Sequence, residues 1–186
     1  MASEGSSVRR ALRDLSTVDR AIYAAVATAS TPTLDEGLVR LSRAADHSVL
    51  WLATAGGLAT LGGRRGRRAA ASGIAAIGAT STVVNALLKP IGRRRRPDRD
   101  GAAVPELRHV SMPRSLSFPS GHAASAFAFA TAAGHDLPGA GPPLLALATV
   151  VAYSRVHTGV HYPGDVVVGS VIGAGGAGLI TALRSR

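Results

Sequence analysis

A chain of 186 residues has room for one domain, and the absence of cysteine excludes a disulfide framework and any thiolate metal site. Its 20 Arg and one Lys outnumber 11 acidic residues, and a net charge of +10 is typical of proteins that bind nucleic acid, anionic lipid or phosphate. Aromatic residues make up only 4%, and the arginines cluster between long uncharged runs, so the composition disfavours a base-stacking nucleic-acid surface and favours a membrane protein that handles phosphate.

The first 46 residues are more polar than the rest of the chain. Residues 1–14 contain no apolar run of the kind found in a signal peptide, and we expect them to form a mobile polar arm. Residues 15–46 alternate apolar and charged positions, which predicts two amphipathic helices separated at Thr31-Pro32-Thr33. Such helices lie at a membrane interface or against a bundle, so we assign residues 15–186 to a single membrane domain.

Five predominantly uncharged stretches follow, at about 48–63, 69–88, 119–134, 140–155 and 165–183. A bilayer core requires about 20 apolar residues, a length that 69–88 reaches. The alternative is a soluble helical bundle, but its helices would need polar faces that these stretches lack. We therefore predict an all-α membrane bundle of about five transmembrane helices. The arginines of 64–68 would form a tight loop, and 89–118 would form a long polar loop.

This threading brings the ends of the second and fourth spans to the same membrane face as the starts of the third and fifth. Polar residues gather at these four ends: Lys89 and Arg96, then Ser120, Gly121 and His122, then Arg155, His161 and Asp165. Each group alone is explained by interfacial charge or by a helix start. Ionisable residues that converge at a lipid boundary are costly, however, and their conjunction indicates a functional site.

The chemistry of phosphate transfer accounts for every residue type in this group. A phosphate dianion requires cations and directed donors such as the N–H groups of a helix start. A neutral imidazole can attack phosphorus while a carboxylate holds its second nitrogen, and another imidazole can act as general acid and then as base. The phosphate-binding candidates are Lys89, Arg96, Ser120, Gly121 and Arg155, and the catalytic candidates are His161 as nucleophile, Asp165 as its partner and His122 as the acid. The scheme needs no metal and no cofactor.

In order along the chain, these residues resemble the signature of the type 2 phosphatidic acid phosphatase superfamily. Its three parts are Lys89 with Arg96-Pro97, then Pro119-Ser120-Gly121-His122, then Ser154-Arg155 with His161 and Asp165. The resemblance implies an integral-membrane lipid phosphate phosphatase that forms a phosphohistidine at His161. Other residues near the signature are expected to have lesser roles. We expect His157 to shape the pocket, and His47, His109 and His135 to be structural or solvated. Arg93, Arg94 and Arg95 would form a solvated basic run that could attract anionic head groups.

The resemblance leaves the substrate open, because members act on phosphatidic acid, phosphatidylglycerol phosphate, polyprenyl diphosphates or phosphorylated polyprenyl sugars. The compact Arg- and Ala-rich sequence is similar to short actinobacterial members, which include the phosphatase of decaprenylphosphoryl-5-phosphoribose in cell-wall synthesis. A vanadate-dependent haloperoxidase and a catalytically silent lipid-binding protein are the alternatives of another class. The arginine count favours a cytoplasmic active site in a bacterial plasma membrane, whereas the dense 64–68 group favours the opposite face.

Overall fold

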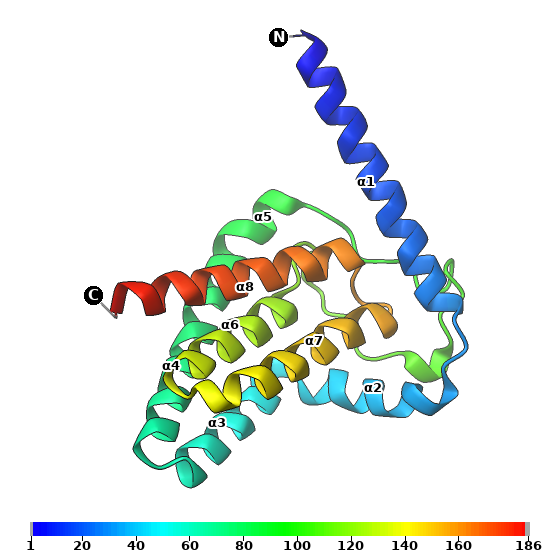
Figure 1. Cartoon of the computed structure of the whole chain (residues 1–186). Coiled ribbons are helices and arrows are strands. Elements are labelled where there is room, and N and C mark those ends of the chain that lie inside the picture. The colour runs from blue at the N-terminus through cyan, green and yellow to red at the C-terminus, as the bar shows by residue number, and fades with distance from the viewer. Residues whose placement is uncertain (1, 185–186) are drawn as a thin grey trace.

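The computed structural model describes residues 2–184, and within them the chain is all-helical (Figure 1). The α-helices are α1 (Ala2–Thr28), α2 (Pro32–Ala44), α3 (Val49–Leu61), α4 (Gly63–Thr82), α5 (Lys89–Gly92), α6 (Gly121–Asp136), α7 (Gly141–His157) and α8 (Pro163–Arg184). A π-helical segment, η2 (Val83–Leu88), joins α4 to α5, and short 3-10 turns lie at η1 (Asp46–Ser48), η3 (Glu106–Arg108) and η4 (Pro138–Ala140). This confirms the predicted all-α class.

Helix α6 lies at the centre of the bundle and packs against α4, α7 and α8, while α3 packs against α4 and α2 against α7 (Figure 1). Small residues allow these close contacts. A Cβ at Gly169 of α8 would lie 2.5 Å from the carbonyl oxygen of Ser120, and one at Gly73 of α4 would lie 2.6 Å from the Phe129 ring. The bundle therefore brings backbones together through glycine, as helices in lipid commonly do.

The exposed surface of α8 is apolar along its whole length. Val167, Val171, Leu179 and Leu183 are each at least 60% exposed. A helix that buries glycines on one face and exposes valines and leucines on the other is typical of a lipid-facing helix. Within residues 2–184, two continuous helices are long and apolar enough to cross a membrane, Gly63–Gly92 and Pro163–Arg184. Helices α3, α6 and α7 contain only 13, 16 and 17 residues, so the predicted count of five spans is not confirmed.

Two boundaries differ from the predictions. The chain reverses at Gly62 and Gly63, where Gly63 has φ +59°, and the arginines of 64–68 lie in the first turns of α4 instead of a loop. A turn of two glycines suffices because Gly63 adopts the left-handed conformation without steric cost. Residues 2–14, expected to form a mobile arm, belong to α1, which ends at Thr28, a few residues before Pro32 begins α2. Met1, Ser185 and Arg186, which fell in the predicted arm and at the domain end, lie outside the described residues.

Candidate active site

His161 lies in the turn between α7 and α8, and Asp165 lies in the first turn of α8, which begins at Pro163. The His161 side chain is 1% exposed, and its Nδ1 is 3.4 Å from Asp165 Oδ2. Its Nε2 is 3.1 Å from Arg96 Nη1. A guanidinium can only donate, so Nε2 accepts and carries no proton, and the ring proton lies on Nδ1 toward Asp165. The structure thus directs the unprotonated nitrogen toward the cationic side of the site.

The environment of His161 keeps its imidazole neutral. Burial lowers the pKa of His161 to about 3, and the charges of Arg96 and Arg155 act in the same direction against the hydrogen bond with Asp165. Asp165 itself is held by the backbone N–H of Tyr162, at 3.0 Å, and by the hydroxyl of Ser117. A buried, neutral and oriented imidazole has the lone pair that nucleophilic attack requires.

Arg155 lies at the end of α7 with its side chain fully buried. Its Nη1 donates to the backbone oxygen of Ser42 at 2.9 Å and to Asp46 Oδ1 at 3.2 Å. Its Nε and Nη2 are buried and have no hydrogen-bond partner in the described part of the chain. Unpaired buried guanidinium N–H groups are unfavourable unless a ligand completes them, and two N–H groups on one edge of the fork match the oxygens of a phosphate.

His122 lies in the first turn of α6 and contacts a residue that the sequence did not single out. Its Nε2 is 2.9 Å from Asp46 Oδ1, the same oxygen that accepts from Arg155. Burial alone would raise the pKa of Asp46, but the hydrogen bond with His122 and the charge of Arg155 hold the pKa of that carboxyl below its usual range. Asp46 is therefore an ionised link between His122 and Arg155. The sequence showed it only as one charge in an amphipathic segment.

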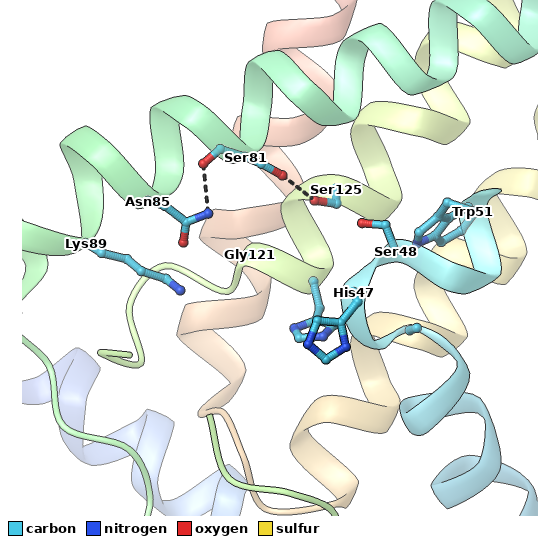
Figure 2. Close-up of a pocket in the computed structure, with 10 residues that line it drawn as sticks. His47, Ser48, Trp51, Ser81, Asn85, Lys89, Gly121 and Ser125 are labelled. Atoms are coloured by element: carbon cyan, nitrogen blue, oxygen red, sulfur yellow. Dashed lines mark hydrogen bonds between the residues drawn. The ribbon is translucent and has the colours of Figure 1, made fainter. Parts of the chain in front are cut away.

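The remaining phosphate-binding candidates differ in their surroundings. Lys89 Nζ donates to the hydroxyl of Ser115 at 2.9 Å, and Arg96 Nη2 donates to that hydroxyl at 3.2 Å. Ser115 therefore joins the two cations, which sequence reasoning missed. Gly121 lies beside Lys89 and His122 on the wall of a cavity of about 150 Å³ (Figure 2). Ser120 is buried and caps α6, its hydroxyl accepting from the N–H of Ala123 at 3.4 Å.

Arg94 departs from the solvated run predicted for its neighbourhood, although Arg93 and Arg95 are exposed as expected. It pairs with Asp165 at 3.0 Å and with Asp19 of α1 at 2.6 Å, and its guanidinium lies 3.9 Å from the centroid of the Tyr162 ring. Arg94 thus holds the carboxylate behind His161 from the side away from the imidazole. Nothing in the local sequence distinguishes it from its neighbours, because its partners come from α1 and α8.

The other histidines lie apart from the candidate catalytic pair, with one exception. His157 is buried, and its Nε2 is 2.9 Å from Asp35 in a network with Arg108 that ties α2 to α7. His109 contacts the carbonyl oxygen of Val104, and His135 lies near Asp136. His47 is the exception, since it lines the cavity beside His122. Within residues 2–184, no group of three or more His, Asp or Glu side chains is arranged to hold a metal ion.

Comparison with known proteins identifies the family. Residues 69–186 match the PAP2 superfamily. The chain is 40% identical over 139 residues to the decaprenylphosphoryl-5-phosphoribose phosphatase of Mycobacterium tuberculosis (strain ATCC 25618 / H37Rv), covering 72% of this chain and 71% of that protein. It is 38% identical over 145 residues to the phosphatase of the same name from Mycolicibacterium smegmatis, covering 77% and 75%.

Solved structures share the arrangement of helices. The transmembrane PAP2 type phosphatidylglycerolphosphate phosphatase from Bacillus subtilis superposes with a TM-score of 0.67 at 23% identity, covering 92% of this chain and 87% of that one. Aquifex aeolicus LpxE superposes with a TM-score of 0.65 at 26% identity, covering 88% and 93%. The fold is therefore that of membrane phosphatases, and the resemblance seen in the three motifs is confirmed. With a family match over more than half of its length, the chain belongs to the PAP2 superfamily.

Proposed function

We propose that this membrane phosphatase hydrolyses a phosphate monoester on a polyprenyl-linked sugar, the class of substrate named for its mycobacterial relatives. The observation that carries the proposal is the convergence, in one buried site, of the neutral imidazole of His161 and the two unpaired N–H groups of Arg155. Together they offer phosphate a nucleophile and a bidentate donor.

His161 Nε2 attacks phosphorus, and the bond between phosphorus and the oxygen of the substrate alcohol breaks. His122 gives its proton to that leaving oxygen, so the alcohol departs neutral and a phosphohistidine remains. His122 then takes a proton from water, whose oxygen attacks phosphorus. The P–N bond breaks, inorganic phosphate leaves, and His161 is restored. Arg96, Arg155 and Lys89 stabilise the charge on the three non-bridging oxygens throughout.

Asp46 acts in this scheme as a positioning residue. Its carboxylate contacts His122 and Arg155 together, so the proton donor and the phosphate-binding fork are held relative to each other. Every step uses side chains of this chain, and we therefore expect hydrolysis without a metal ion.

We also propose that α3, α4, α6, α7 and α8 all cross the bilayer and that the candidate active site faces the cytoplasm of a bacterial cell. The exposed apolar side chains of α3, α7 and α8 support the first statement, and the continuous helix that includes α4 is long and apolar enough to span. The larger number of arginines on the side of the active site supports the second.

One experiment tests the activity. Inorganic phosphate would be measured from phosphorylated polyprenyl ribose, polyprenyl diphosphate, phosphatidic acid and phosphatidylglycerol phosphate, in buffer with a metal chelator. We expect release from the wild type, fastest with the phosphorylated sugar, and essentially none from His161→Ala. Undiminished release by His161→Ala would refute the mechanism. A different preferred lipid would refute the proposed substrate, and dependence on an added divalent ion would refute metal independence.

A further inference from the structure

A polar cavity continues from the candidate active site between α4, α6 and the start of α3 (Figure 2). Lys89, Gly121 and His122 form the wall that it shares with the site. In the proposed function, His122 protonates the leaving oxygen. The cavity therefore lies on the side where the alcohol part of the substrate is bound, away from the buried turn that carries His161.

The far wall of the cavity presents hydroxyl and amide groups. Ser81 Oγ and Ser125 Oγ are 3.3 Å apart, and Asn85 Nδ2 donates to the backbone oxygen of Ser81 at 2.9 Å (Figure 2). A primary amide has two N–H donors and one carbonyl acceptor, so Asn85 retains capacity for further hydrogen bonds. Ser48 adds another hydroxyl from the opposite side. A helix surface that would otherwise face lipid is thus polar at this point.

Irregular backbone occurs on both sides of the cavity. Asn85 lies in the π-helical segment Val83–Leu88, where the N–H of Lys89 bonds to the carbonyl of Val84, five residues back. On the opposite side, His47 and Ser48 are consecutive non-glycine residues in the left-handed region, with φ of 52° and 61°. π-helical turns and left-handed non-glycine residues cost energy and concentrate at functional sites. Both irregularities here coincide with residues that line one cavity.

We infer that this cavity is a subsite for a hydroxyl-bearing leaving group of about the size of one monosaccharide, and that Asn85, Ser81 and Ser125 determine the preference for it. The inference rests on the proposed function. A volume of about 150 Å³ is small beside the ~300–1,000 Å³ of typical ligand pockets, and its Ser and Asn side chains suit the hydroxyl groups of a single sugar. The acyl esters of a glycerol backbone accept hydrogen bonds but cannot donate them, so they would leave the amide oxygen of Asn85 without a donor. We expect this to lower the rate with phosphatidic acid relative to a sugar.

The test compares two substrates that are both phosphate monoesters of a primary alcohol, phosphorylated polyprenyl ribose and phosphatidic acid, in the same detergent. The quantity measured is the ratio of their kcat/KM values. We expect Asn85→Leu to lower this ratio about tenfold, because it removes the amide while keeping the volume. The double variant Ser81→Ala/Ser125→Ala, which removes a hydroxyl pair without leaving an unpaired partner, should also lower it.

Thr82→Ala is the matched control. Thr82 neighbours Ser81 on the same helix, but its hydroxyl bonds to the carbonyl of Gly78 and it does not line the cavity. The ratio of kcat/KM values for the two substrates in Thr82→Ala should equal that of the wild type. A wild-type ratio in Asn85→Leu and in the double variant would overturn the subsite. A wild type that prefers phosphatidic acid would refute the proposed substrate. Undiminished hydrolysis by His161→Ala would instead refute the proposed function, so the two failures are distinguishable.

Discussion

Asp46 is the residue through which the two halves of the site meet. Its Oδ1 contacts His122 Nε2 and Arg155 Nη1, so replacing Asp46 removes a contact from the proton donor and a contact from the phosphate-binding guanidinium. We expect Asp46→Asn to lower kcat on a lipid phosphate about 10- to 100-fold, as loss of an orienting partner of a functional histidine does.

A double-mutant cycle identifies the route of this effect. If Asp46 acts through His122, then Asp46→Asn should cost little more in a His122→Ala background, and its effect should shrink with an activated aryl phosphate whose leaving group needs no proton. Purely additive losses would contradict positioning of His122 and would assign Asp46 to Arg155 alone.

The buried imidazole of His161 also makes stability depend on pH. Burial lowers its pKa to about 3, from an ordinary value of 6.5. Between these pH values the unfolded chain binds a proton here that the folded protein does not, so the free energy of unfolding falls as pH falls through this window. We expect the melting temperature of the detergent-solubilised wild type to drop more between about pH 7 and pH 5 than that of His161→Asn.

His135→Asn is the control for this comparison, since His135 is half-exposed at the other end of α6. The melting temperature of His135→Asn should decrease between pH 7 and pH 5 by the same amount as that of the wild type. Equal decreases in melting temperature for the wild type and His161→Asn would contradict a buried imidazole that excludes protons.

At the scale of the elements, the contact between α6 and α8 places Asp165 opposite the start of α6, where the Ser120 N–H donates to the Asp165 carbonyl at 2.9 Å. Glycine residues in α8 allow its backbone to lie close to that of α6. A Cβ at Gly173 would collide with the carbonyl of Ala124, whereas one at Gly175, on the same helix, would meet nothing within 4 Å.

Gly173→Val should therefore reduce the free energy of unfolding by about 1–3 kcal/mol and reduce activity, because α8 must move away from α6. Thermal unfolding in detergent and phosphate release would measure the two effects. Gly175→Val should change neither by much. Equal behaviour of the two variants would show that the helices tolerate a wider separation.

At the scale of the whole molecule, cysteine labelling tests the cytoplasmic location of the site together with the crossing of the bilayer by α4, on which the five-span threading depends. The cysteine-free chain makes this experiment simple. Ser111 and Arg65 are exposed and belong to opposite ends of the bundle in the proposed threading. In intact cells, we expect an impermeant maleimide to label Arg65→Cys and to label Ser111→Cys only after lysis.

Labelling of Ser111→Cys in intact cells would refute the cytoplasmic site. Identical behaviour of both variants, before and after lysis, would refute the threading, since the two positions would then share one side of the membrane.

The sequence by itself determined the helical class, the two long apolar segments that form α4 and α8, and the residues of the signature, because each rests on local spacing. His161 and Asp165 are four residues apart, and Pro163 begins a helix between them, so their contact follows from the chain alone. The hydropathy of α4 and α8 likewise depends only on neighbouring residues.

Only the tertiary structure decided the partners of these residues, because those partners are distant in the chain. Asp46 lies 76 positions from His122, and Arg94 lies 71 positions from Asp165. In the sequence, each was one charge among several in an amphipathic or basic segment, and only helix packing distinguishes it from its neighbours. The polar cavity has the same origin: Asn85, Ser125 and Ser48 come from three helical segments, and no local pattern shows that they face one space.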